Sequence, residues 1–406
     1  MASLGETSNA QVACQRCTEL AKPVNDLMLV ARAYTILGRI AAAQGDPKQA
    51  LAFHRQALEF ARRIGSRRDV IGALMNIGDS LADQGDLAGA QKSYEDSLAV
   101  AQEIDDKGQA IILLNNIATL AQAAGKFPAA LKLYQQSLDQ ARAVEDKGSV
   151  ARARGNIGTV LTLQGNFSSA LESISQAVQE VEETGNKSDQ ALILMALGNT
   201  YLEQGALPPA EQNYRASVDL AAQSNDKGII AQGQLSMADL RLQQGRSVEA
   251  QVLARQAADE FHTENMKDLE AAARNILAVA LLDSDRTDEA AKQLDIIASL
   301  SSQDAIENLT TAIIAARIQA HAGKASEARK ALTSVVAQAK AIGAPGLQFE
   351  AQLAEGEIGL FGGDKSAALT LLSNLQKNAA ERGFKQFESK AKKLAKQISI
   401  KEPYAQ

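Results

Sequence analysis

Glycine recurs at forty-residue intervals along this chain of 406 residues. The series runs through Gly45, Gly85, Gly125, Gly165, Gly205 and Gly245, then Asp285, and continues after a two-residue shift with Gly323 and Gly363. Glycine is the residue that most readily ends a helix in the left-handed conformation. We therefore expect one helix to end and another to begin at each position. A unit that repeats every forty residues cannot bury its apolar face alone, so it must stack on copies of itself.

Small and large residues keep a fixed distance from each turn glycine. Seven positions before it stand small residues, namely Gly38, Gly78, Ala118, Gly158, Gly198 and Ala238. Five positions after it stand Ala50, Ala90, Ala130, Ala170, Ala210 and Ala250, and four further on come His54, Tyr94, Tyr134, Ile174 and Tyr214. The small residues allow two antiparallel helices to approach closely. The larger side chain lies one turn beyond the alanine on the same face and is expected to fill the space between neighbouring pairs.

Local capping signals and composition support helices throughout. Asp106, Asp146 and Asp226 each begin a DKG triplet, where an aspartate is well placed to cap the next helix. Apolar residues make up 46% of the chain, proline occurs seven times and tryptophan is absent. The sequence therefore predicts an all-α protein whose core is built from small and aliphatic side chains.

This pattern resembles the tetratricopeptide repeat (TPR), although the period is forty instead of about 34 residues and the usual Trp and Pro are missing. The longer form is similar to repeats of kinesin light chain, as in LLNNIATLAQAAGKFPAAL, and of the Pins adaptor, as in ALMNIGDSLADQGDLAGAQ. Residues 349–384 resemble the C-terminal ends of TPR arrays in bacterial multidomain regulators. The resemblance implies a helical-hairpin solenoid, wound as a right-handed superhelix, with a concave groove lined by the first helix of each pair.

About nine helix pairs are expected, at 26–64, 66–104, 106–144, 146–184, 186–224, 226–263, 266–300, 303–342 and 345–382. Residues 1–25 then form a partial N-terminal repeat with a leading helix, 26–382 the solenoid, and 383–406 a capping helix and tail. No linker interrupts the array, so we expect one domain. Because the chain begins in mid-repeat, it is also expected to be a fragment of a longer protein.

No motif for catalysis is visible, so we predict no enzymatic activity, no metal and no cofactor. The glycines follow the repeat instead of clustering in a phosphate loop, and no HExxH or nucleophile-elbow motif occurs. Cys14 and Cys17 lack a second pair and are interpreted as buried apolar fillers. His54 occupies the ring position of its repeat. His262 and His321 have no acidic or cysteine partner at ligand spacing, which favours a structural or solvated role.

The net charge and the hydropathy of the chain limit the classes of binding partner that are expected. A net charge of -6 gives no general attraction to nucleic acid, and no secretory signal or membrane-length apolar segment occurs, so a cytoplasmic protein is expected. The C-terminal helix carries lysines at 385, 390, 392, 393, 396 and 401. A basic amphipathic helix can bind membranes or acidic partners, but a solvated cap is favoured because solenoids need polar ends.

The candidate binding residues lie on the first helices. Three asparagines at forty-residue spacing, Asn76, Asn116 and Asn156, would form a ladder of amides along the groove. An amide can pair with both the N–H and the C=O of a bound backbone, and the resemblance implies that role for these residues. It adds Asn115 and, three positions further along each helix, Asp79, Thr159 and Asn199. The alternative is that these asparagines hydrogen-bond the adjacent helix and fix the packing of the repeats.

Two functions from different classes remain. The first is a non-catalytic scaffold that binds a peptide or a partner protein in the concave groove. The second is a sensory domain of a larger bacterial signalling protein, a kinase or a transcription regulator, in which the solenoid binds a small ligand or a regulator. A purely structural homo-oligomer is a third possibility, and the sequence does not determine the oligomeric state.

Overall fold

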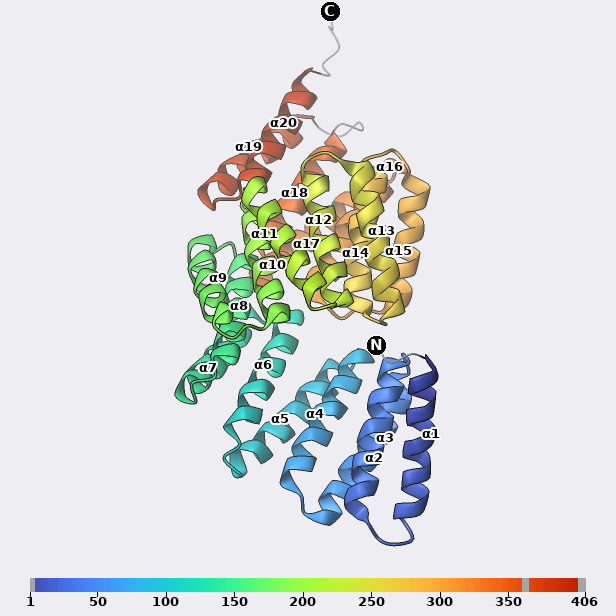
Figure 1. The fold of residues 1–406 in the computed structure, drawn as a ribbon. Coiled ribbons are helices and arrows are strands. Elements are labelled where there is room, and N and C mark those ends of the chain that lie inside the picture. Colours follow the sequence, from blue (N-terminus) through green and yellow to red (C-terminus); the bar gives the residue numbers. More distant parts are fainter. Residues whose placement is uncertain (1–3, 360–364, 401–406) are drawn as a thin grey trace, which may run out of the picture. The chain divides into compact units, whose positions relative to one another are not determined.

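The computed structural model describes residues 4–359 and 365–400, and its regular elements there are all helices. The first helices of the pairs are α2 (Leu27–Ala43), α4 (Arg67–Asp83), α6 (Lys107–Ala123), α8 (Lys147–Leu163), α10 (Lys187–Glu203), α12 (Lys227–Gln243), α14 (Lys267–Leu282), α16 (Ala305–His321) and α18 (Pro345–Ile358). The second helices are α3 (Pro47–Ile64), α5 (Leu87–Glu103), α7 (Phe127–Ala143), α9 (Phe167–Glu182), α11 (Leu207–Gln223), α13 (Ser247–Thr263), α15 (Thr287–Leu300), α17 (Ala325–Ile342) and α19 (Lys365–Glu381). Helix α1 (Leu4–Ala21) precedes these pairs and α20 (Lys385–Ile400) follows them (Figure 1). The predicted all-α class and its helix-pair architecture are confirmed.

The turns form as the glycine register predicts. Between the helices of a pair, the left-handed residues are Gly45, Gly85, Gly125, Gly165, Gly205, Gly245, Asp285 and Gly323. Gly363 lies outside the described residues. A second left-handed series joins one pair to the next, also at forty-residue spacing, at Asn25, Gly65, Asp105, Glu145, Gly185, Asn225 and Asn265. The sequence did not reveal this second series, because asparagine and aspartate tolerate the conformation and replace glycine at most of its positions.

The predicted N-caps are confirmed. The carboxylates of Asp106, Asp146 and Asp226 each accept a hydrogen bond from the backbone N–H three residues ahead, at 3.2, 3.0 and 3.1 Å. Each cap satisfies one of the N–H groups that the first turn of a helix leaves without an intrahelical partner.

The small residues allow the two helices of a pair to touch. A Cβ atom added at Gly78 would lie 2.4 Å from the Tyr94 ring, and one at Gly198 would lie 2.5 Å from the Tyr214 ring. The core around Tyr94 also contains Leu113 from the next pair. The ring therefore packs on its own first helix and on the following pair, as its position in the repeat predicts.

A repeated buried serine adds a polar connection within three pairs. Ser97, Ser137 and Ser217 each donate a hydrogen bond to a backbone carbonyl of their own first helix, at 2.9, 3.1 and 2.7 Å. All three side chains are buried. Because a buried hydroxyl is costly without a partner, this bond fixes the register of the two helices against each other.

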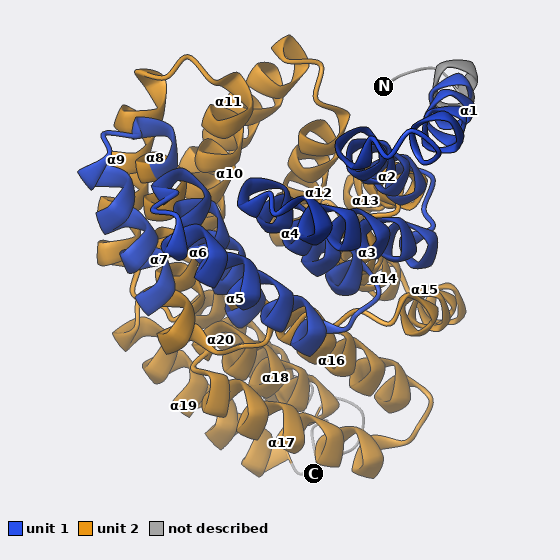
Figure 2. Cartoon of the chain, turned by 90° about the horizontal axis from the view of Figure 1, so that it is seen from below, with its two compact units in different colours: residues 1–121, 132–149 blue, residues 122–131, 150–406 orange. Residues whose placement is uncertain are grey.

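The chain divides into two compact units (Figure 2). Unit 1 comprises residues 1–121 and 132–149, and unit 2 comprises residues 122–131 and 150–406. Each unit is described by itself, and the single-domain organisation stays a prediction. No helix in the described ranges 4–359 and 365–400 is long and apolar enough to cross a membrane.

In unit 1, the two cysteines lie on α1 and are half-buried. Cys14 and Cys17 are free and partly exposed, so the prediction of fully buried fillers holds only in part. The core of the next pairs contains Leu58, Leu74 and Ile77. Small aliphatic side chains thus form most of this core, as the composition suggests.

In unit 2 the C-terminal helices pack against helices much earlier in the chain. The Phe384 ring packs edge-on against Phe167, with centroids 4.7 Å apart, and against Phe349, at 5.3 Å. The Arg382 guanidinium donates to the Gln164 carbonyl at 3.3 Å across 218 residues of sequence. The segment containing α20 therefore reaches back to the turns beside α8 and α10, and unit 2 closes on itself. A terminal cap alone, as expected from the sequence, would not make these contacts.

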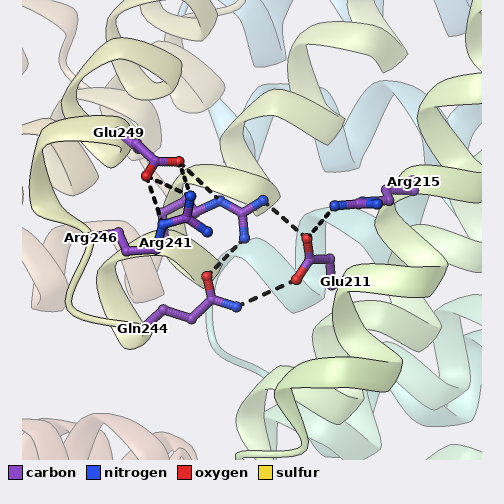
Figure 3. A network of polar contacts seen from close by, with 6 residues as sticks. All are labelled: Glu211, Arg215, Arg241, Gln244, Arg246 and Glu249. Atoms are coloured by element: carbon purple, nitrogen blue, oxygen red, sulfur yellow. Dashed lines mark hydrogen bonds and ion pairs between the residues drawn. The ribbon is translucent and has the colours of Figure 1, made fainter.

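A network of charges joins three consecutive helices of unit 2 (Figure 3). Arg241 on α12 is buried and contacts Glu211 of α11 at 3.1 Å and Glu249 of α13 at 3.7 Å. Arg215 and Gln244 also bond Glu211, at 2.7 and 3.4 Å. The Arg241 hydrogen bond is the main cause that holds the pKa of the Glu211 carboxyl below its ordinary value. Since every charge in the network is paired, we assign it a structural role.

Candidate functional site

Unit 2 contains a cavity of about 700 Å³. Its walls come from the first helices of six successive pairs, namely α8, α10, α12, α14, α16 and α18, and from α20. Among the described residues, no second helix contributes a lining residue. The arrangement matches the expected groove, with the difference that α20 lies across it and helps to enclose it.

The lining residues keep the forty-residue register. Thr159, Asn199 and Asp239 occupy one repeat position, and Leu163, Glu203 and Gln243 occupy the position four residues later. Residues four apart lie on one face of a helix, so both series point to the same interior. The repeat therefore places a chosen side chain in the cavity once per pair.

The predicted site residues are distributed over both units. Asn76 and Asp79 lie on α4, Asn115 and Asn116 on α6, Asn156 and Thr159 on α8, and Asn199 on α10. Thr159 and Asn199 line the cavity of unit 2. Asn156 is half-buried and is not one of its lining residues. The structure thus brings together only part of the predicted set.

Several of these positions also serve packing. The Tyr94 hydroxyl donates to the Asp79 carboxylate at 2.6 Å, and the Tyr214 hydroxyl donates to the Asn199 side-chain oxygen at 2.8 Å. Asn275, which lines the cavity, is buried and donates to the Glu307 carboxylate of the adjacent helix α16 at 3.1 Å. The packing alternative therefore describes Asn275, whereas Asn199 keeps its NH₂ group for another acceptor.

Two amides of the proposed ladder stay open. Among the described residues, the side chains of Asn76 and Asn116 form no hydrogen bond, and both are half-buried. A half-buried amide without a protein partner can bind an added ligand at no cost in broken protein contacts. The role of these asparagines in binding stays a prediction.

The six carboxylates that line the cavity among the described residues were not predicted as site residues; two of them, Asp283 and Glu357, pair with Arg317. Glu203, Asp239, Glu307 and Glu350 come from α10, α12, α16 and α18. Glu203 and Asp239 stand at repeat positions that the sequence shows, so acidic residues on the groove face could have been noticed there. Glu307 and Glu350 lie beyond the two-residue shift of the repeat, where counting by forty no longer identifies the inner face.

Burial raises the pKa of the carboxylates that line the cavity. Burial, with help from Asp239 and Glu350, raises the pKa of Glu203 to about 8, against the opposing effect of Lys390. Burial raises the pKa of Glu307 to about 7. Burial likewise raises the pKa values of Asp239 and Glu350, although Lys390 opposes both shifts. Negative charge in this cavity is therefore incompletely balanced by the protein.

Two of the three cations that line the cavity within residues 4–359 and 365–400, Arg317 and Lys390, face these acids in different ways. The Arg317 guanidinium contacts Glu357 at 3.0 Å and Asp283 at 3.6 Å, so its charge is already paired. Lys390 of α20 lines the cavity but forms no ion pair within 4.0 Å in the described part of the chain. It lies instead 5.8 Å from the centre of the Phe387 ring. Lys390 thus lowers the negative potential without neutralising any one carboxylate.

Clusters of metal-ligand side chains and the histidines were compared with the expectations over residues 4–359 and 365–400. No group of three or more His, Cys, Asp or Glu side chains there has the geometry to hold a metal ion. One prediction needs correction, because His262 has an acidic partner. Its Nδ1 lies 3.2 Å from the Glu270 carboxylate, which also binds Arg274 at 2.7 Å. The sequence hides this pair because the turn between α13 and α14 places residues eight apart side by side.

Comparison with protein families identifies the repeat. A model of the MalT-like TPR region matches residues 105–356, and a tetratricopeptide repeat model matches residues 30–64 and 70–104. The chain belongs to the MalT-like tetratricopeptide-repeat family. A search of curated proteins found no match. The predicted membership of the TPR superfamily is confirmed.

Solved TPR structures share the fold at low identity. A Rap protein complexed with competence and sporulation factor is 13% identical, covers 94% of this chain and 99% of its own, and has a TM-score of 0.56. The Rap conjugation gene regulator of plasmid pLS20, in complex with the Phr* peptide, is 12% identical, with coverages of 70% and 78% and a TM-score of 0.57. Aspartyl phosphate phosphatase F from Bacillus subtilis is 12% identical, with coverages of 70% and 73% and a TM-score of 0.57.

Proposed function

We propose that this TPR protein is a non-catalytic binding scaffold that takes a peptide, or an extended segment of a partner protein, in the enclosed groove of unit 2. The observation that carries the proposal is the cavity of about 700 Å³, walled by first helices and closed by α20. Its volume lies within the range of known ligand sites, roughly 300–1,000 Å³. The Rap regulator complexed with the Phr* peptide, a protein of similar fold, supports a peptide as the ligand class.

The polar residues of the inner face would recognise the backbone of the bound segment. The Asn199 side-chain oxygen is occupied by Tyr214, so its NH₂ group would donate to a peptide carbonyl. Considered by itself, the inner face of unit 1 would offer the same kind of contact through Asn76, Asp79, Asn115 and Asn116 on α4 and α6, and Asn156 would do so on α8 of unit 2. Backbone recognition of this kind tolerates different side chains, which suits a regulatory adaptor.

A blocking variant tests the proposed site. Heptapeptides selected from a random library on the purified protein would be measured by calorimetry against Ala196→Trp, which fills the cavity from α10. The matched control is Ala222→Trp, on an exposed position of α11. Binding lost in the first variant and kept in the second would support the proposal. Full binding by both folded variants, or no selectable peptide, would contradict it.

The asparagine ladder has a separate test. Replacing Asn76, Asn116 and Asn156 together by alanine removes about one neutral hydrogen bond each, and should weaken the peptide by roughly 2–4 kcal/mol, on the order of a hundredfold. The melting temperature should change little at Asn76 and Asn116, which form no side-chain hydrogen bond in the described residues, because alanine favours helix. A lower melting temperature with unchanged peptide affinity would assign the three residues to packing instead.

A sensory domain that binds a small molecule is the second candidate. The match to the MalT-like TPR region and the volume of the cavity, which lies in the range of small-molecule sites, favour it. A thermal-shift screen of amino acids, sugars, nucleotides and amines would test this candidate. A stabilising compound that loses its effect in Ala196→Trp but not in Ala222→Trp would support it, and a screen without such a compound would argue against it.

A further inference from the structure

The charges that face the cavity of unit 2 are mostly negative. The acidic residues are Glu203, Asp239, Asp283, Glu307, Glu350 and Glu357, and the basic residues are Arg317, Lys390 and Lys393. Arg317 is held by Glu357 and Asp283. The remaining four carboxylates therefore face two lysines that form no ion pair with them within 4.0 Å in the described residues.

Two of these carboxylates lack any close partner. Glu203 and Glu350 are half-buried, and in the described residues neither side chain forms a hydrogen bond or an ion pair. Both keep surface that faces the cavity. Enclosed carboxylates are normally hydrogen-bonded or paired, because losing water without a replacement is costly. An occupant that donates hydrogen bonds would provide that replacement.

Buried amide oxygens show the same deficit of donors. The side-chain oxygens of Gln243 and Gln386 are buried and have no hydrogen-bond partner, and both residues line the cavity. The Gln243 NH₂ group points to Asp239, at 3.5 Å, which leaves the oxygen as the unsatisfied atom. Carboxylates and amide oxygens are all acceptors, so acceptors and negative charges outnumber the cationic donors on the walls of the cavity.

We propose that the cavity of unit 2 binds a peptide through a cationic side chain, arginine or lysine, held by Glu203 and Glu350. The inference rests on the proposed function and specifies its ligand. A guanidinium or ammonium supplies several donors together with the missing charge, and a charge-assisted pair is stronger than a neutral hydrogen bond. Asp239 and Glu307 add to the attraction from α12 and α16.

Lys390 of α20 acts as the competing cation. It is the first charge to oppose the raised pKa of Asp239 and Glu350, and it also opposes that of Glu203. A cation of the ligand would stabilise the same carboxylates that Lys390 stabilises in the free protein. Because the two positive charges compete for these carboxylates, removing the charge of Lys390 should tighten binding. Helix α20 thereby sets the affinity of the site through its charge as well as through its packing.

Binding should release protons. Glu203 and Glu307 hold protons near neutral pH in the empty protein, since their pKa values are raised to about 8 and about 7. A bound cation lowers these pKa values, and by linkage the affinity rises with pH between about 6 and 9. The charged groups that face Glu203, Glu307 and Glu350 from the surrounding helices are Asp239, Glu357, Asp268, Asp304, Arg317, Lys390 and Lys393.

A matched peptide series tests the proposal by calorimetry. The probes are three capped pentapeptides, Gly-Ala-X-Ala-Gly, with arginine, its neutral isostere citrulline, or glutamate at X, together with the small cation agmatine. At pH 8 the arginine peptide should bind at least tenfold more tightly than the citrulline peptide, and the glutamate peptide most weakly. The ratio of the arginine affinity to the citrulline affinity should be smaller at pH 6. At pH 8, binding of the arginine peptide should release protons to the buffer.

Charge variants assign the effect to named residues. Glu203→Gln combined with Glu350→Gln should reduce arginine binding at least tenfold, to the level of citrulline. Glu172→Gln, the same change on the exposed face of α9, should have no effect. Lys390→Gln should increase the affinity for the arginine peptide. Since glutamine has nearly the same shape as glutamate, all variants should fold, and melting temperatures check this.

The outcomes separate this inference from the proposed function. Equal affinity for the arginine and citrulline peptides, both blocked by Ala196→Trp, would overturn the cationic preference and leave peptide binding intact. If agmatine binds and none of the peptides binds, the cationic site would be supported and peptide binding refuted. An unchanged arginine affinity in the double glutamine variant would overturn the assignment to Glu203 and Glu350.

Discussion

At the scale of single residues, one position per repeat determines how closely the two helices of a pair pack. The ring position is occupied by His54, Tyr94, Tyr134, Ile174 and Tyr214, each buried. Where tyrosine stands there, its hydroxyl bonds the polar residue that lies on the groove side of the first helix, as Tyr94 bonds Asp79 and Tyr214 bonds Asn199. The same contact thus completes the core and orients a side chain of the inner face.

Tyr134 should therefore be among the most sensitive core residues. Its ring is 1% exposed, and its hydroxyl lies 3.0 Å from the Thr119 hydroxyl. Tyr134→Ala should lower the free energy of unfolding by about 3–5 kcal/mol, as for other buried aromatic truncations. Tyr134→Phe loses one hydrogen bond and should cost only about 0.5–1.5 kcal/mol. Denaturant titration measures both, and a loss below about 1 kcal/mol for alanine would contradict the core position.

His54 should make unit 1 sensitive to mild acid. Burial, and then Arg39, lowers its pKa to about 4, against an ordinary value of 6.5. Because the folded pKa is the lower one, the stabilisation is present above pH 6.5 and is lost as pH falls towards 4. The loss should reach about 2–3 kcal/mol.

Comparing stability at several pH values checks the role of His54. His54→Phe keeps a ring beside Gly38 and removes both the titrating group and the unpaired Nδ1 atom. Its free energy of unfolding should depend less on pH between 4 and 6.5 than that of the native protein. Parallel pH profiles for the two proteins would exclude the histidine as the cause.

At the scale of helices, turns serve two purposes. The turn between α10 and α11 reverses the chain, and it also lies against the start of α20. A Cβ atom added at Gly205 would lie 2.9 Å from the backbone nitrogen of Gln386, whereas one at Gly245 would meet no atom within 4 Å. Both glycines have left-handed backbone, with φ of 78° and 75°. The two positions separate the strain of the turn from the contact with α20.

Gly205→Ala should therefore be more harmful than Gly245→Ala. The second variant has only the left-handed strain, about 1 kcal/mol. The first adds the overpacking of two backbones, for a total of about 2–4 kcal/mol. Hydrogen exchange of α20 should accelerate in Gly205→Ala alone. Equal stability of the two variants would mean that α20 does not depend on this contact.

The second helix of the seventh pair is the expected weak element of unit 2. Asp285 replaces the turn glycine, α15 has 14 residues, and its buried residues are Ala290 and Ile297. The preceding α14 is well buried, so the expectation applies to residues 287–300. Few buried contacts favour local opening. Hydrogen exchange should be faster in α15 than in α11, and equal protection of the two helices would refute this.

At the scale of the whole molecule, the packing of α20 onto the first helices of unit 2 forms a cavity that no single repeat contains. Each first helix of unit 2 contributes a few side chains to the inner face, and α20 covers them. Acidic residues that would be hydrated on an open solenoid then lie in a confined space with one another. Their pKa values rise for this reason, and the stability of unit 2 depends on their protonation.

Unit 2 should consequently lose stability as pH rises. Glu203 has a folded pKa of about 8 against an ordinary 4.5, so its stabilisation is present below pH 4.5 and declines as pH rises to about 8. Glu203→Gln should be more stable than the native protein by at least about 1 kcal/mol at pH 9, and nearly equal at pH 5. Thermal unfolding at both pH values checks this, with Glu172→Gln as control. A constant difference across this range would contradict the buried titration.

Much of the architecture follows from local rules that a single repeat already contains. Gly85 ends a helix because of its own backbone, Asp106 caps one through a bond three residues long, and Tyr94 meets Gly78 fifteen residues away within one hairpin. The all-α fold, the helix pairs and the inward direction of Thr159 and Asn199 were predictable for this reason. The binding role of the asparagine ladder stays a prediction, since periodicity gives a direction and no ligand.

The enclosed site was decided by tertiary structure alone. The contacts of Phe384 with Phe167 and of Arg382 with Gln164 depend on the summed rotation of several repeats. Small changes per repeat add up over such a stack, and the forty-residue count itself shifts before Glu307 and Glu350. No sequence pattern therefore predicts that Glu307 and Glu350 line the same cavity as Glu203, or that Lys390 lies beside them. The sequence by itself determined which helix faces turn inward, and the closure of unit 2 determined that those faces share one acidic cavity.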